Sequence, residues 1–140
     1  MKQFEIIDIS GDVGIRAFGK SIEEVFKNSA IGMYSLITDL EGVKADKNIS
    51  ISVENNSLEG LLVSWLNELI FQFDAYNFIG KDISIKALSS QPSALKAEIR
   101  GEEFDTERHE RKLLIKAATY HKLKVEKVRD IWEADIIFDI

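Results

Sequence analysis

Residues 57–73 read SLEGLLVSWLNELIFQF, and this segment determines the class of fold. Its large apolar residues recur at steps of three and four, the spacing of one face of an α-helix. Ser57 stands directly before the stripe, where a hydroxyl accepts a hydrogen bond from the first free amide groups of a helix. Asn77 and Gly80, which follow it, are residue types that end helices. We therefore predict a buried central helix here.

A second helix is predicted over residues 21–40. Ser21 and Glu24 have the spacing of a capping box, in which the side chains satisfy free amide groups at the start of a helix. Apolar residues then recur at helical spacing, and Gly42 suits a C-terminal cap. The chain is thus expected to contain two main helices.

The other apolar segments are short or alternate with polar residues, which is typical of β-strands. Extended structure is predicted for residues 4–9, 15–19, 48–54, 83–88, 94–99, 113–121, 123–128 and 131–140. Residues 10–14 are predicted to break the chain, Pro92 to lie in a hairpin connection, and residues 102–112 to form a loop. This order favours a single α+β domain over residues 1–140, with the two helices packed on largely antiparallel β-sheet structure.

The composition excludes several classes of protein. The chain has 140 residues, 18 basic and 24 acidic, with a net charge of −6, so strong direct binding to nucleic acid is not expected. It has no cysteine and two histidines, which argues against a disulfide scaffold, a thiolate nucleophile and a cysteine zinc site. No apolar stretch approaches the roughly 18 residues of a membrane span, so we expect a soluble, cytoplasmic protein.

The segment Gly11-Asp12-Val13-Gly14 is the most unusual part of the sequence. The chain has no phosphate-binding glycine-rich loop, nucleophile elbow or paired-histidine helix motif. Asp12 fits two roles, an acceptor for amide groups in a turn or a ligand for a hard cation. Asp139 and Ile140 offer further oxygen atoms at the terminal carboxylate. These oxygens converge on a divalent cation if the last strand lies near Asp12.

Four other features have weaker signals. His109 and His121 stand in no triad pattern, so hydrogen bonding is their expected role and general-base catalysis the alternative. Lys116 interrupts an apolar run, where it either points outward from a sheet or binds an anion or a carboxylate. The basic residues of the loop 102–112 form a modest patch, interpreted as a solvated loop with an RNA site as the alternative.

Five segments, in this order along the chain, resemble the archease family: DVGIRAFG (12–19), AIGMYSLITD (30–39), WLNEL (65–69), IKAATYH (115–121) and IIFDI (136–140). Archeases are small partners of the RtcB-type RNA ligase, which joins RNA halves in tRNA splicing and RNA repair and depends on manganese and GTP. The resemblance implies a non-catalytic activator that promotes guanylylation of the ligase's active-site histidine and repeated turnover. Some members also broaden the nucleotides that the ligase accepts. Such an activator acts on GTP and RNA only through the ligase that binds them.

The same resemblance implies that Asp12, Asp139 and Ile140 bind a metal ion. Calcium is the expected ion, with magnesium or manganese as alternatives. Lys116 and His121 lie in a matching segment and are candidate residues for activating or contacting the ligase. Family members usually read His-Thr-Ala-Asp where this chain reads ISGD, residues 9–12. Ile9 therefore removes one polar group near the site and leaves the three oxygen positions intact.

Two other functions account for parts of the sequence. A stand-alone phosphate-ester hydrolase would use Asp12, Asp139 and His121 around a cation to activate water. A chaperone-like binding module would account for the acidic surface. Assays of the isolated protein distinguish them, because a hydrolase turns over phosphoesters alone, a chaperone suppresses aggregation of unrelated proteins, and an activator does neither without its ligase.

Overall fold

The computed structural model describes residues 1–140, except for the side chain of Ile9. The strands are β1 (Phe4–Ile9), β2 (Asp12–Gly19), β3 (Lys47–Asn55), β4 (Phe78–Ser90), β5 (Ser93–Glu103), β6 (Ala117–Ala118), β7 (Lys124–Val128) and β8 (Ile131–Asp139). The helices are α1 (Ile22–Ile37), α2 (Leu58–Tyr76) and a short 3-10 helix at Leu40–Gly42. Within the described chain, neither α-helix has the length and apolar composition needed to cross a membrane.

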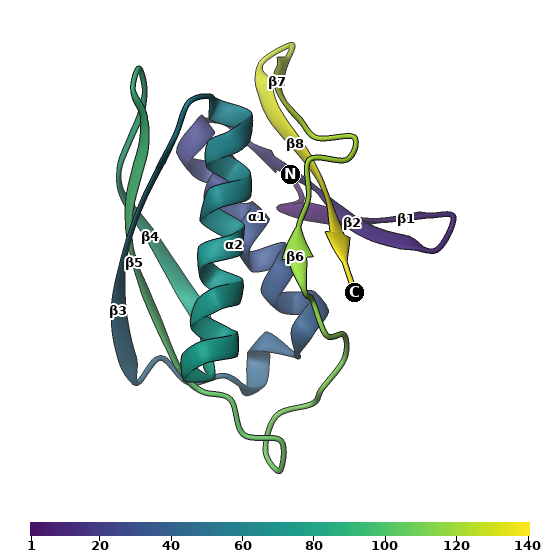
Figure 1. Ribbon diagram of the computed structural model, residues 1–140, viewed down its shortest axis with the longest axis vertical. Coiled ribbons are helices and arrows are strands. Elements are labelled where there is room, and N and C mark those ends of the chain that lie inside the picture. Colours follow the sequence, from purple (N-terminus) through teal and green to yellow (C-terminus); the bar gives the residue numbers. More distant parts are fainter.

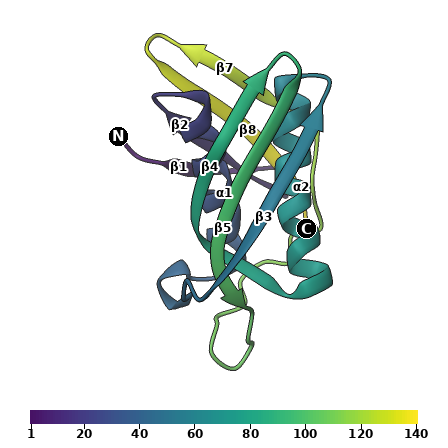
Figure 2. The same cartoon turned by 90° about the vertical axis from the view of Figure 1, so that its left-hand side faces the viewer.

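Two antiparallel sheets enclose the helices (Figure 1). One sheet has the strand order β3-β5-β4, and Figure 2 shows it face on. The other has the order β1-β2-β8-β6, with β7 also paired to β8. This arrangement confirms the predicted α+β class with two main helices on antiparallel sheet structure.

The predicted helix caps are present in the structure. Ser57 Oγ accepts a hydrogen bond of 3.0 Å from Gly60 N, and Asn77 ends α2 in the left-handed conformation with a φ of 61°. Ser21 Oγ accepts from Glu24 N at 3.1 Å. The apolar stripe of α2 is buried, and Trp65 Nε1 donates to the carbonyl of Phe26 on α1 at 3.0 Å. This bond satisfies the buried indole and ties the two helices together.

Helix α1 ends three residues earlier than predicted. Thr38 is extended, and the Asp39 side chain accepts a hydrogen bond from Glu41 N, which caps the 3-10 turn at Leu40–Gly42. The prediction of Gly42 as the cap of α1 was wrong, because Asp39 starts a separate turn before the chain reaches that glycine.

The predicted break at residues 10–14 was also too long. The turn consists of Ser10 and Gly11, with φ values of 47° and 87°, and β2 begins at Asp12. Positive φ at both central residues is the geometry of the two-residue turns that join twisted antiparallel strands. Asp12 is therefore the first residue of a strand and not part of a loop.

The strand predicted over residues 113–121 was wrong, since only Ala117 and Ala118 belong to a strand. The backbone amides of Lys112 and Leu113 instead donate to the carbonyls of Ile37 and Leu36, at 2.9 and 3.0 Å. These carbonyls are among those that the end of a helix leaves free, so this segment completes α1 and not a sheet. The predicted 83–88 and 94–99 hairpin is correct in place but longer, and β5 takes Glu102 and Glu103 from the predicted loop.

Candidate functional site

Strands β2 and β8 lie side by side in the five-stranded sheet, with Arg16 opposite Asp135 and Val13 opposite Phe138. Arg16 Nε donates to Asp135 Oδ1 at 2.7 Å, and Nη2 donates to Oδ2 at 3.0 Å. The hydrogen bond to Asp135 raises the pKa of the Arg16 guanidinium. Ile15 on β2 is fully buried, so the alternate residue Arg16 marks the face of the sheet that points away from the helices.

The register brings two predicted site residues together. One step beyond the pair Val13 and Phe138, the antiparallel order places Asp12 opposite Asp139. Side chains alternate along a strand, so residues four positions from Arg16 and Asp135 lie on the same outward face. Both aspartates are exposed, and Ile140 follows directly. The two carboxylates therefore share one face at one end of the sheet.

Lys116 lies next to this end of the sheet. Its backbone N–H donates to the carbonyl of Asp139 at 2.8 Å, and its side chain is exposed. His121 lies farther from Asp139. The chain runs antiparallel to β8 here, and Thr119 N–H already donates to the carbonyl of Ile137, two residues before Asp139. The exposed His121 comes two residues after Thr119. The structure thus places Lys116, but not His121, beside Asp139.

The donor atoms at this end are all oxygens. Carboxylates and main-chain oxygens are the ligands that calcium, magnesium and manganese prefer, and calcium takes about six to eight of them. Asp12, Asp139 and Ile140 therefore fit such an ion in kind, with water needed to complete its shell. Among the described residues, no group of three or more His, Cys, Asp or Glu side chains is placed to hold a metal. The side chain of Ile9 lies outside the described residues.

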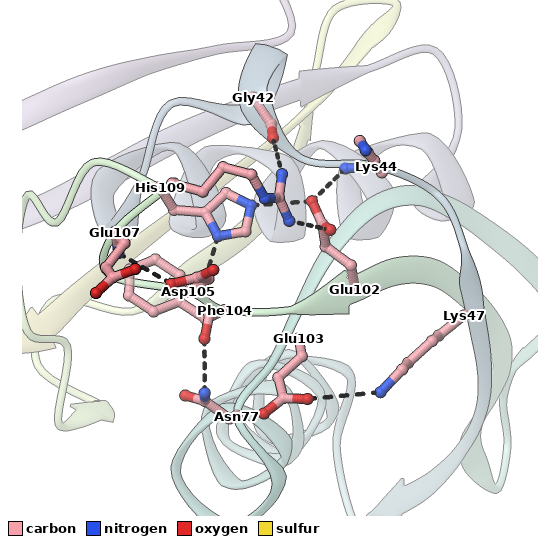
Figure 3. A network of polar contacts seen from close by, with 11 residues as sticks. Gly42, Lys44, Lys47, Asn77, Glu102, Glu103, Phe104, Asp105, Glu107 and His109 are labelled. Carbon is pink, nitrogen blue, oxygen red and sulfur yellow. Dashed lines mark hydrogen bonds and ion pairs between the residues drawn. The ribbon is translucent and has the colours of Figure 1, made fainter.

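A buried carboxylate network lies elsewhere, where β5 ends (Figure 3). The Glu102 side chain is 8% exposed. One of its oxygens pairs with Arg108, and the other accepts from Lys44 N–H at 2.6 Å and contacts His109 Nε2 at 2.9 Å. Burial by itself would raise the pKa of Glu102, but the hydrogen bonds from Arg108, Lys44 and His109 outweigh it and lower the pKa to about 2.

His109 is the second buried member of this network. Its Nδ1 accepts a hydrogen bond of 2.9 Å from Asp105 N, so Nε2 carries the proton that faces Glu102. Its ring stacks on Phe104 with 5.3 Å between the ring centroids, and the Arg111 guanidinium lies 5.6 Å from the centroid of the same Phe104 ring. The predicted hydrogen-bonding role of His109 is confirmed, although the residue is more deeply buried than expected.

Little in the sequence points to the Glu102 network. Glu102, Arg108 and His109 lie in a segment without helical or strand periodicity. The only feature of this segment that the sequence shows is its mixture of acidic and basic residues. Both carboxylate oxygens of Glu102 are occupied, and the network joins β5 and the loop after it to the segment around Lys44. It therefore stabilises the fold and offers no free reactive group.

Comparison with known proteins decides the family. Residues 4–140 match the model of the Archease protein family (MTH1598/TM1083). This chain belongs to the archease family. The protein archease of Pyrococcus abyssi is 36% identical over 142 residues, covering 100% of both chains. That of Methanosarcina barkeri is 32% identical over 141 residues, covering 99% of this chain and 97% of the relative.

Solved structures agree with this family assignment. The solution structure of Methanobacterium thermoautotrophicum protein 1598 has a TM-score of 0.87 and 31% identity, with 100% of each chain covered. The crystal structure of a Thermotoga maritima archease, described as a possible chaperone, has a TM-score of 0.67 at 20% identity, covering 96% of this chain and 94% of that one. The second comparison supports the fold alone.

Proposed function

We propose that this archease-family protein is a non-catalytic activator of an RtcB-type tRNA-splicing RNA ligase. It promotes guanylylation of the ligase's active-site histidine and repeated turnover, and acts on GTP and RNA only through the ligase. Family membership over residues 4–140 supports the partner. The observation that carries the proposal is the β2–β8 register, whose pair Val13 and Phe138 stands one residue from Asp12 and Asp139, both of them exposed.

In this proposal Asp12, Asp139 and the oxygens of Ile140 hold a divalent cation, with calcium first and magnesium or manganese as alternatives. A bound cation supplies positive charge that stabilises phosphate oxygens. The residues of this chain orient and present that charge at an exposed sheet end. Lys116 beside Asp139 is a ligase-contact residue, and His121 is a second candidate contact further from the aspartates.

A stand-alone hydrolase needs a general base at the cation. His121 lies away from Asp12 and Asp139, and His109 is held in the buried Glu102 network. Neither histidine is therefore placed to act as a general base at a cation bound by the two aspartates. A chaperone-like binding module is the second candidate function. The exposed aromatic side chains Phe71, Tyr76 and Tyr120 favour it.

The decisive experiment is multiple-turnover RNA ligation by a cognate RtcB-type ligase at fixed GTP and metal, with a substoichiometric amount of this protein. We expect more product per ligase molecule, and loss of the effect in Asp12→Asn. Asp130→Asn, a matched substitution of an exposed aspartate in the β7–β8 turn, keeps the effect. An unchanged yield with an active ligase refutes the proposal. Suppressed aggregation of unrelated proteins would then favour the chaperone.

A further inference from the structure

A groove of about 580 Å³ crosses the exposed side of α2. In Figure 1 this helix faces the viewer between β3 and β6. Phe71 and Glu68 of α2 form part of its floor, Val53 and Glu54 of β3 line one side, and Tyr120, beyond β6, lines the other. The groove shares no residue with the acidic end of the sheet, and none of the contacts described above explains it.

Large aromatic side chains are exposed in and beside this groove. Phe71 is 51% exposed and Tyr120 is 63% exposed. Tyr76 is 67% exposed and meets Phe71 edge to face, with 6.0 Å between ring centroids. Aromatic side chains gathered on one surface bury much apolar area at low entropic cost, and they dominate the energy of protein interfaces. Such a group indicates an interaction site.

The side of the groove that carries Tyr120 is held in place before any partner binds. The Asn67 side chain makes two hydrogen bonds to the backbone of Ala118, accepting from its N–H at 2.8 Å and donating to its carbonyl at 3.2 Å. Thr119 then bonds the carbonyl of Ile137 through its N–H and its hydroxyl. Tyr120 follows directly, so it comes immediately after two residues that are anchored to α2 and β8. A preformed groove spares its partner the cost of ordering it.

The charge of the groove selects its occupant. Glu54 and Glu68 contribute carboxylates, and no lysine, arginine or histidine is among the described residues that line it. A phosphate backbone is repelled by such a surface, whereas lysine or arginine next to an apolar side chain complements it. The chemistry therefore fits a protein segment in which basic residues flank an apolar or aromatic one.

We propose that this groove docks a basic, apolar segment of the RNA ligase, an inference that rests on the proposed function. Strand β6 connects the groove to the acidic end of the sheet, because Ala118 bonds Asn67 and Ala117 lies opposite Asp139. One partner can therefore contact both surfaces across β6. The groove then supplies affinity, and the aspartates act on the bound ligase.

The test separates binding from stimulation. Phe71→Ala, Tyr120→Ala and Glu54→Lys are titrated into a cognate RtcB-type ligase, with Val128→Ala and Glu107→Lys as exposed controls outside the groove. Direct binding and multiple-turnover ligation are both measured. Each groove variant is expected to weaken binding about tenfold and to raise the concentration for half-maximal stimulation equally, with the maximal rate unchanged. Asp12→Asn is expected to show the converse, with normal binding to the ligase and no increase in the maximal rate of ligation.

Thermal melts check that every variant folds. If Phe71→Ala does not fold, the test rests on Tyr120→Ala and Glu54→Lys. Groove variants that bind the ligase like the unmodified protein overturn the docking proposal and leave the activator proposal standing. Binding of single-stranded RNA that these variants lose, or a dimer that they dissociate, also overturns it in favour of another occupant. If the unmodified protein neither binds nor stimulates an active ligase, both proposals fail.

Discussion

Arg16 on β2 and Asp135 on β8 face each other and form an ion pair with two hydrogen bonds, of 2.7 and 3.0 Å. This bidentate arrangement fixes the pairing of the two strands more tightly than a single hydrogen bond would. The same register, continued one residue past the pair Val13 and Phe138, sets Asp12 against Asp139. A structural ion pair in one row of the sheet thus aligns two like charges in another, and like charges directly opposed weaken a sheet unless something neutralises them.

Asp139→Asn should change stability in opposite directions with and without a divalent cation. Without a cation, the substitution removes the repulsion from Asp12, so we expect the free energy of unfolding to rise by about 0.2–1 kcal/mol. With millimolar calcium, the unmodified protein should gain stability from binding while the variant does not. Thermal melts with calcium and with a chelator measure both effects. An equal calcium response in Asp139→Asn and the control Asp130→Asn would contradict the cation site.

Glu102→Gln should destabilise the protein by about 2–3 kcal/mol. The amide cannot accept all the hydrogen bonds that Glu102 takes from Arg108, His109 and the Lys44 N–H, and His109 stays buried. Urea unfolding measures the loss. Glu103→Gln is the matched control, because that neighbouring side chain is exposed and pairs with Lys47 at only 3.8 Å. Equal stability of the two variants would show that the network contributes little.

The contribution of Glu102 should depend on pH. Its pKa in the folded protein, about 2, lies below the ordinary 4.5, so folding favours the ionised carboxylate. This contribution is complete above pH 4.5 and is lost as the pH falls from 4.5 toward 2, by about 3 kcal/mol at most. The stability difference between the unmodified protein and Glu102→Gln should therefore narrow over that range. A difference that stays constant from about pH 7 to about pH 2.5 would exclude this linkage.

Asn67→Ala should loosen β6 without unfolding α2. The substitution removes both hydrogen bonds to Ala118, so we expect a loss of about 1–2 kcal/mol and faster amide exchange at Ala118. Gln72→Ala is the control, since the side chain of Gln72 donates to Glu68 on the same helix. Hydrogen exchange followed by NMR resolves the two effects. Unchanged protection of the Ala118 amide would rule out the anchoring role of Asn67.

The elements that could be predicted from the sequence are those with local causes. Ser21 and Ser57 cap their helices through groups three residues away, and the apolar stripe of α2 has a strict period. The end of α1 could not be predicted from its apolar period, because the Asp39 side chain starts a separate turn two residues beyond it. The segment 113–121 could not be predicted, because the amides of Lys112 and Leu113 bond helix carbonyls that lie far away in sequence. A segment whose sequence pattern is typical of a strand thus forms hydrogen bonds with the end of a helix instead.

The same distinction holds for the candidate site. Asp12 and Asp139 stood out as oxygen donors in unusual contexts, but only the β2–β8 register shows that the strands bring them to the same end of the sheet. The burial of Glu102 depends on contacts from two segments outside β5, the loop at Arg108 and His109 and the backbone at Lys44, and no periodic pattern in the sequence marks it. Residue types could be predicted as candidates, whereas their neighbours are set by tertiary pairing.

Strand β8 pairs with β2 along one edge and with β6 and β7 along the other, and this position affects the order of folding. Strands β3, β4 and β5 come from one continuous part of the chain, whereas Arg16 and Asp135 are 119 positions apart. Closing so long a loop costs entropy before the pairing gives any return. We expect the three-stranded sheet and the helices to assemble first, and β2, which pairs with β1 on one edge, to lack a partner on its other edge until β8 has been synthesised. The acidic end of the sheet is then among the last parts of the molecule to form.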